Sequence, residues 1–203
     1  WVTGKRVTNS WAHPDENSSV YELKAYVENV FARLGLHMHD LVVGNLTDDI
    51  YAAGLSVQTR GGERLATFGI VTKKLLKAFD IDNEVYYADF NWKELLKSIR
   101  NVKVSYTEIS KFPAVKRDLA LLLDKKVQFA EIEKIAYETE KKLLKEVSLF
   151  DVYEGKNLEA GKKSYAVSFL LQDENATLND KQIDKVMQKL VKNLEDKLGA
   201  KLR

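Results

Sequence analysis

Apolar residues recur at helical spacing in three segments of the first hundred residues. The first runs from about residue 20 to residue 34, where Ser19 and Glu22 fit a capping box and Gly35 fits a helix end. A shorter helix is expected after Thr72, and another is expected to open at Asn91 and run to about Ile99. The apolar face of the first helix consists of Val20, Leu23, Val27, Val30, Phe31 and Leu34.

Between these helices the pattern changes to one that favours strands. Strands are expected at 37–43, 50–58, 64–71 and 85–90, with a hairpin turn at 60–63. Residues 1–17 combine turn and strand material. The first half of the chain therefore predicts a mixed α+β domain.

The second half alternates strands and helices in a simpler order. Strands are predicted at 117–124, 147–154, 163–172 and 200–203. One helix carries Phe129, Ile132, Ala136, Thr139 and Leu143 on a single face, and a second opens at a capping box formed by Asn179 and Gln182 and ends at Gly199. This βαββαβ order predicts a ferredoxin-like fold, in which two helices cover one face of an antiparallel sheet and leave the other face open.

The polar stretch 101–110 has no clear period and separates the two halves. We therefore expect a domain boundary near Tyr106, with one domain at 1–106 and the other at 107–203.

Alternation along the strands of the second half sorts their side chains into two faces. Under the helices we expect Tyr165, Val167, Phe169, Leu171, Phe150, Val152, Leu119, Leu121, Leu123, Ala200 and Leu202. On the open face we expect Ser164, Ala166, Ser168, Leu170, Gln172, Leu149, Asp151, Tyr153, Asp118, Ala120, Lys201 and Arg203.

The predicted open face suits unpaired nucleic-acid bases. An aromatic ring stacks on a base with about 1–3 kcal/mol, while carboxylates and hydroxyls bind base edges and cations meet phosphates. The candidate cations are Arg117, Lys162, Lys163, Lys201 and Arg203. The alternative is that this face is merely solvated or packs on another domain, because ferredoxin-like sheets serve many functions.

Composition and charge exclude several classes of protein. The 203 residues are 45% hydrophobic and 31% charged, with 32 basic and 30 acidic side chains, which excludes a polybasic tail and an acidic disordered chain. Cysteine is absent, so disulfides and thiolate metal sites are excluded. The longest apolar run has five residues, too few to cross a membrane. Because the chain opens with Trp1, we expect it to be a piece of a longer protein.

No arrangement of side chains predicts catalysis. His37 and His39 would share a face of a strand, but a metal site needs three or four ligands and His13 is distant in sequence. A phosphate loop of the kind a small hydrolase would need is not found after the first strand of the second half, at 124–128.

Five segments of the second half resemble one known family. They are Phe112–Ala120 (FPAVKRDLA), Leu149–Gly155 (LFDVYEG), Gly161–Ala166 (GKKSYA), Ala176–Asp180 (ATLND) and Gly199–Arg203 (GAKLR). In this order they resemble the ferredoxin-fold anticodon-binding domain that ends the bacterial phenylalanyl-tRNA synthetase β chain.

The first half resembles the preceding domain of the same β chain, a catalytically inactive copy of the class II synthetase core. The matching segments are Val20–Lys24, Phe68–Val71, Leu75–Ile81 and Val85–Phe90. Glu22 stands where the family usually has Asp, and Thr72-Lys73 replaces the usual His-Pro.

The resemblance implies part of a cytoplasmic α2β2 ligase that joins phenylalanine to tRNA with ATP and Mg²⁺. The α chain of that family carries the active site, so this chain is expected to have no catalytic residue, cofactor or metal of its own. Residues 107–203 would grip the anticodon stem-loop of the phenylalanine tRNA, and 1–106 would support assembly with the α chain. Asp151, Tyr153 and Ser164 match family positions near the anticodon bases, with Tyr153 as the stacking residue and Ala166 beside them.

Each of these residues also has a purely structural interpretation. Asp151 could pair with Lys163 across the strands, and Ser164 could simply clear space for a base. Arg117 and Arg203 could form ordinary surface ion pairs. The segment 177–180 could be a functional loop or only the start of a helix. For the whole protein, the alternative is a ligand-sensing or dimerisation module that does not bind RNA.

Overall fold

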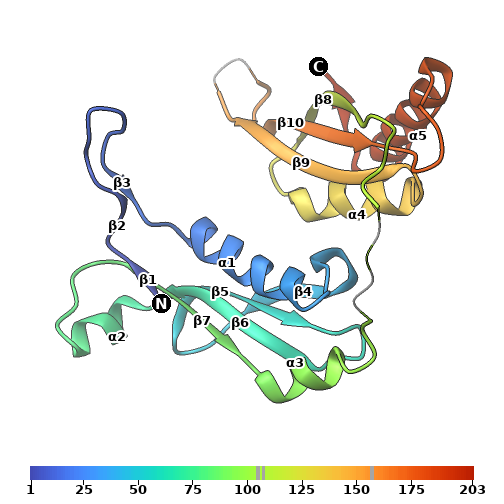
Figure 1. Cartoon of the computed structure of the whole chain (residues 1–203). Helices are drawn as coiled ribbons and strands as arrows, with labels where there is room; N and C mark the ends of the chain where they lie inside the picture. The colour runs from blue at the N-terminus through green and yellow to red at the C-terminus, as the bar shows by residue number, and fades with distance from the viewer. Residues whose placement is uncertain (104–105, 107, 156–157) are drawn as a thin grey trace. The chain divides into compact units, whose positions relative to one another are not determined.

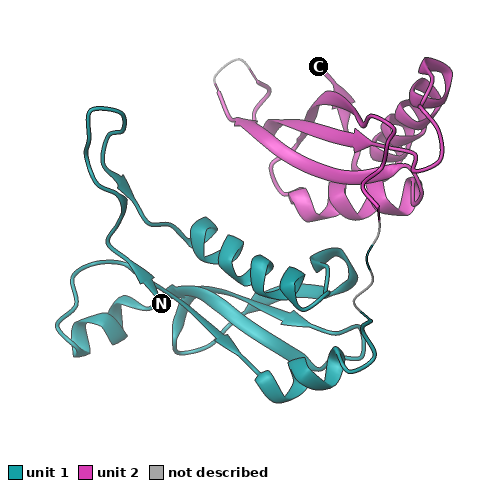
Figure 2. Ribbon diagram, in the orientation of Figure 1, with its two compact units in different colours: residues 1–106 teal, residues 107–203 magenta. Residues whose placement is uncertain are grey.

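The computed structural model describes residues 1–103, 106, 108–155 and 158–203. The chain divides into two compact units, Trp1–Tyr106 and Thr107–Arg203, which are coloured separately in Figure 2. We call them unit 1 and unit 2.

Unit 1 is built on a five-stranded antiparallel sheet with the order β1-β7-β6-β5-β4. The strands are β1 (Val2–Thr3), β4 (Val42–Leu46), β5 (Tyr51–Gln58), β6 (Arg64–Val71) and β7 (Val85–Phe90). Helix α1 (Val20–Arg33) lies along one face of this sheet (Figure 1) and buries Leu23, Val27 and Phe31 in the core. Shorter elements complete the unit: the hairpin of β2 (Lys5–Val7) and β3 (Glu16–Asn17), the helices α2 (Lys73–Ala78) and α3 (Trp92–Ser98), and the 3₁₀ turn η1 (Met38–Asp40).

The expected strand at 37–43 is wrong. Residues 38–40 form the 3₁₀ turn η1, and the strand begins only at Val42. His37 and His39 therefore do not share a strand face, although their rings stack in parallel with centroids 5.4 Å apart. The capping box expected at α1 is half formed: the Ser19 side chain accepts from the Glu22 amide, while Glu22 accepts from the Tyr26 hydroxyl.

Unit 2 confirms the predicted ferredoxin-like βαββαβ order. Its elements are β8 (Val115–Asp124), α4 (Phe129–Thr139), β9 (Leu144–Tyr153), β10 (Lys162–Leu171), α5 (Asp180–Leu198) and β11 (Lys201–Leu202). The strands form an antiparallel sheet with the order β11-β8-β10-β9, so the first and third strands occupy its centre.

Both helices of unit 2 contribute to a single apolar core on one side of the sheet. Ile132 and Ala136 of α4 and Leu190 and Leu194 of α5 are buried there. They pack with the predicted inward residues of the central strands, which are Leu121, Leu123, Tyr165, Val167, Phe169 and Leu171. Capping boxes fix the starts of both helices, at Asn179 as predicted and also at Gln128.

Strand β9 departs from the predicted alternation because it contains a β-bulge. Leu149 pairs with Val167 and Asp151 pairs with Ala166, so Phe150 is an extra residue with no partner of its own on β10. Leu149 consequently packs against the core instead of lying on the open face. Phe150 is 56% exposed, so the prediction that it lies under the helices is wrong. Val152 pairs with the core residue Tyr165, so its register agrees with the predicted inward face, but it stays 48% exposed.

Candidate nucleic-acid interface

The side of the unit 2 sheet opposite to the α4/α5 core is here called the open face. Residues paired directly across antiparallel strands point to the same side, so the register assigns its members. They are Lys116, Asp118, Ala120, Leu122 and Asp124 of β8, Lys162, Ser164, Ala166, Ser168 and Leu170 of β10, Glu146, Ser148, Asp151 and Tyr153 of β9, and Lys201 of β11.

Tyr153 lies at the end of β9 on the open face, directly opposite Ser164. Its side chain is 37% exposed. A Cβ atom added at Gly155 would overlap the Tyr153 hydroxyl and ring, so the tyrosine lies against the glycine backbone. Gly155 therefore helps to set the position of the ring.

Arg203 covers part of the Tyr153 ring. Its guanidinium carbon lies 5.3 Å from the ring centroid, within the range of a cation–π contact. The backbone amide of Arg203 donates to the carbonyl of Ala120 at 3.0 Å, which anchors this end of the chain to β8. The contact joins a predicted cation to the predicted stacking residue.

The open face near Tyr153 and Asp151 also carries the small residues Ser164, Ala166 and Ala120. Asp151 is exposed and pairs with Ala166, which in turn pairs with Ala120 on β8. Ser164 is only 6% exposed. The alternative pairing of Asp151 with Lys163 is not formed, because the two residues lie on opposite sides of the sheet.

The predicted cations divide into two groups. Lys201 is exposed and lies opposite Leu122, and Lys162 lies opposite Asp124 at the start of β10, so both belong to the open side. Lys163 is 7% exposed on the helix-covered side, where its Nζ donates to the Tyr165 hydroxyl at 2.6 Å and lies 4.4 Å from that ring. The expectation that Lys163 flanks the open face is therefore wrong.

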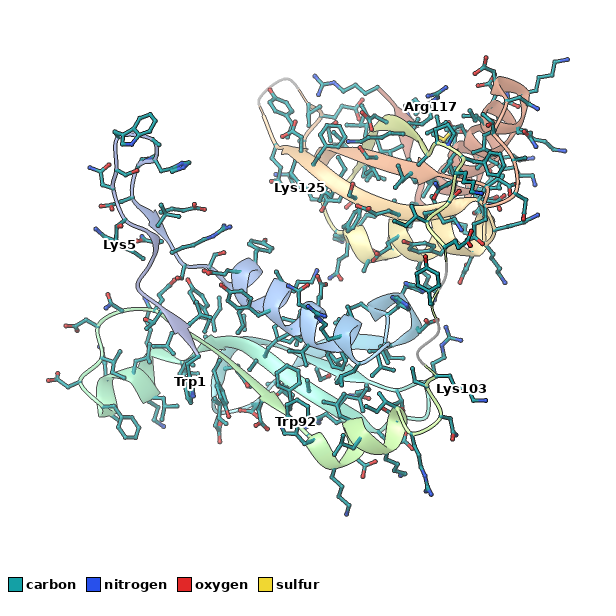
Figure 3. The ribbon with its side chains drawn as sticks, in the orientation of Figure 1. Trp1, Lys5, Trp92, Lys103, Arg117 and Lys125 are labelled. Carbon is teal, nitrogen blue, oxygen red and sulfur yellow. The ribbon has the colours of Figure 1, made fainter. Side chains whose placement is uncertain are left out.

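Arg117 also falls on the helix-covered side of the register. The residue, labelled in Figure 3, lies opposite the core residue Phe169, and its Nη1 donates to the Lys116 carbonyl at 3.1 Å. Leu202 was expected to point inward, and its register agrees, but the side chain remains about half exposed at the edge strand.

Two residues of the open face were not singled out by sequence reasoning. The Lys116 ammonium lies 5.7 Å from the centroid of the Phe150 ring. The position of Lys116 could have been read from its even spacing with Asp118 and Ala120. The position of Phe150 could not, because it depends on the bulge.

Neither a cluster of metal ligands nor a membrane-spanning helix occurs in the part of the chain that the structure describes. Its His, Asp and Glu side chains form no group of three or more that could hold a metal ion. Among the same residues, no helix has both the length and the apolar character needed to span a membrane.

Two family models together match most of the chain. Residues 110–203 match the ferredoxin-fold anticodon-binding domain, and residues 1–92 match the CLM domain of the phenylalanyl-tRNA synthetase β chain. The fold and these matches thus define the class of protein: an anticodon-binding domain joined to a synthetase-related α+β domain.

Relatives with high identity extend over all 203 residues. The phenylalanine–tRNA ligase β subunit of Bacteroides fragilis is 85% identical, that of Bacteroides thetaiotaomicron 84%, and that of Porphyromonas gingivalis 53%. Each match covers 100% of this chain and 25% of the relative, so the chain spans about a quarter of the length of these relatives. The chain belongs to the family of phenylalanine–tRNA ligase β subunits.

Proposed function

We propose that the open face of unit 2 binds the anticodon stem-loop of the phenylalanine tRNA, and that the chain does so as part of a phenylalanine–tRNA ligase. The observation that carries this proposal is the group formed by Tyr153, Arg203 and Asp151 on the sheet face opposite to the α4/α5 core. The match of residues 110–203 to an anticodon-binding family supports the same conclusion over a ligand-sensing or dimerisation module.

The chemistry of the group suits bases that have left a stem. The Tyr153 ring offers a flat apolar surface on which a base stacks, and the Asp151 carboxylate accepts hydrogen bonds from exocyclic amines on a base edge. Ala166 and Ala120 leave room above the sheet for a base to approach closely. Ser164 is buried opposite Tyr153, and its role in the proposed site is to leave space for a base because its side chain is small.

The cations of the open side complete the proposed site. Arg203 next to Tyr153 can stack on a neighbouring base or bind a phosphate through its planar fork of donors. Lys201 and Lys162 add positive charge at the border of the face, where the backbone of the loop would pass. Lys163 and Arg117 have no part in this contact.

The role proposed for unit 1 is structural. As an inactive relative of a class II synthetase core, residues 1–106 would support assembly with the α chain in an α2β2 enzyme of the cytoplasm. ATP and Mg²⁺ would be used by the assembled ligase for phenylalanylation of tRNA. The active site that would use them is assigned to the α chain.

A titration with RNA tests the proposal. A fluorescently labelled phenylalanine anticodon stem-loop should bind the chain, and Tyr153→Ala should weaken binding between about fivefold and a hundredfold. Tyr153→Phe should bind almost as well as the original chain, because stacking needs the ring and not the hydroxyl. A chain that is indifferent to the stem-loop, or a Tyr153→Ala variant with unchanged affinity, would refute the proposal.

A further inference from the structure

We propose that Phe150 and Lys116 form a second stacking platform on the open face, which receives the nucleotide next to the one that stacks on Tyr153. This inference rests on the proposed function, because it assigns a further RNA-binding residue to the same face. It comes from the bulge in β9 and from one contact between strands.

The bulge is what turns Phe150 outward. Regular alternation would place Phe150 and Val152 beneath the helices and Leu149 on the open face. Because Leu149 already pairs with the core residue Val167, the extra residue is left without a partner and joins Asp151 opposite Ala166. The apolar core of unit 2 accordingly contains Leu149 and not Phe150.

The contact with Lys116 identifies the side on which the ring lies. Lys116 pairs with Leu170, a residue of the open face. Its strand, β8, is separated from β9 by β10. Its ammonium approaches the Phe150 ring to 5.7 Å from the centroid. The ring is therefore assigned to the open side, which is the side of Asp151 and Tyr153.

The result is a pair of matched aromatic–cation groups on one surface. Tyr153 has Arg203 over its ring, and Phe150 has Lys116 over its ring. In each group the ring can stack on one base, and the cation can neutralise the phosphate of the same nucleotide. Asp151 lies between the two rings in sequence, where its carboxylate can reach the edge of either base.

The spacing fits neighbouring nucleotides. Tyr153 follows Phe150 by three residue steps, a distance of at most about 10 Å along β9 and less across a bulge. Nucleotides of an RNA loop that are splayed apart can cover such a distance, with each base on its own ring. The open face would thus hold two consecutive loop nucleotides.

The ring of Phe150 is also available for such contact. Phe150 is more exposed than Tyr153, at 56% compared with 37%. Removing an exposed ring leaves the core intact, so Phe150→Ala should fold like the original chain. Phe79, which is exposed in unit 1 and remote from the open face in sequence, offers a matched control.

The test places a fluorescent base analogue, 2-aminopurine, at each loop position of the phenylalanine anticodon stem-loop in turn. With the original chain, stacking should quench the fluorescence at two neighbouring positions. Phe150→Ala should restore fluorescence at one of them and weaken binding by at least about fivefold, while Tyr153→Ala should restore the other. Phe150→Trp should keep the quenching, and Phe79→Ala should change nothing.

Two results would overturn the inference while leaving the proposed function standing. In the first, Tyr153→Ala weakens binding and Phe150→Ala does not. In the second, both variants affect the same position of the loop, so that a single platform serves. If Phe150→Ala changes only the self-association of the chain in sedimentation, the ring belongs to a protein contact. If the original chain does not bind the stem-loop, both the inference and the proposed function are refuted.

Discussion

At the scale of single residues, the position of Tyr153 depends on a glycine. Gly155→Ala should push the tyrosine ring away from its place, because the added methyl group would overlap the ring. The displaced atoms are at the far end of a side chain, so the chain should still fold. We expect several-fold weaker binding of the stem-loop in a titration, with little change in the unfolding midpoint.

Gly44→Ala is the control for this substitution. A Cβ at Gly44 meets only the Ser56 hydroxyl at 3.8 Å, an ordinary contact in unit 1. It should leave RNA binding unchanged. Equal affinity of the Gly155→Ala variant and the original chain would mean that the tyrosine does not need this glycine to bind RNA.

A comparison of Lys201 with Lys163 distinguishes a lysine proposed to bind RNA from one that is buried. Lys201→Met should reduce the slope of log affinity against log salt by about 0.7, the value for one phosphate of a single strand. Lys163→Met should leave that slope unchanged, because Lys163 bonds to Tyr165 on the helix-covered side. Titrations at a series of salt concentrations measure both, and a reduced slope for Lys163→Met would contradict the assignment of faces.

The difference between these lysines follows the alternation, because Lys163 stands two residues before the inward Tyr165 whereas Lys201 alternates with the inward Ala200 and Leu202. Both stand at strand ends beside small residues, and side-chain type alone favours exposure for both. Register decides between them, since Lys163 pairs with the core residue Leu123. Asp151, Tyr153 and Ala166 lie on the predicted face because alternation is regular in β10 around Ala166 and in β9 after the bulge.

At the scale of elements, strands and helices with a strong period were predictable and the bulge was not. Strands β8 and β10 and helix α5 match their predictions within two residues, since apolar periodicity reflects burial directly. The bulge at Phe150 leaves no such trace, because apolar residues occupy 149, 150 and 152 in either arrangement. It is fixed by pairing with β10 and by the packing of Leu149.

The start of α5 is a cap and not a part of the proposed binding site. Asn179 and Gln182 hydrogen-bond to each other's backbone amides, at 2.9 and 3.1 Å. Asn179→Ala should lower the free energy of unfolding of unit 2 by about 1 kcal/mol, measured by urea unfolding, without changing RNA affinity. Asn179→Asp should retain most of the stability. A loss of affinity at unchanged stability would instead favour the functional-loop interpretation.

The sheet of unit 1 should be sensitive to alkaline pH. Burial raises the pKa values of Tyr51, Tyr86 and Tyr87 above the ordinary value of about 10. In the unfolded chain these groups ionise first, so their contribution to stability is complete below about pH 10 and is lost as the pH rises above it. Tyr51→Phe should reduce this loss in unfolding measured from pH 8 to 11, whereas exposed Tyr21→Phe should not.

At the scale of the whole molecule, binding must come from local charge. The net charge is only +2, so long-range attraction of the chain for RNA is weak. The proposed site gathers cations where the register brings β8, β10 and β11 together, at Lys116, Lys162, Lys201 and Arg203. A sequence average cannot reveal this arrangement, because the register brings together cations that are far apart in the sequence.

Removal of unit 2 from the complete ligase should separate the two proposed roles. A β subunit that lacks residues 107–203 should still assemble with the α chain, since assembly is assigned to unit 1. Charging of tRNA at low tRNA concentration should fall sharply, because the anticodon contact is lost. Size-exclusion chromatography and an aminoacylation assay measure the two effects, and full charging activity would show that unit 2 is dispensable.

The central claim is that the open face of unit 2 receives the anticodon loop. The most direct measurement is NMR chemical-shift mapping of the chain during titration with the phenylalanine anticodon stem-loop. The shifts should concentrate at Asp151, Tyr153, Ala166, Lys201 and Arg203, with the outer surfaces of α4 and α5 little affected. Shifts centred on those helices or on unit 1, or no shifts at all, would contradict it.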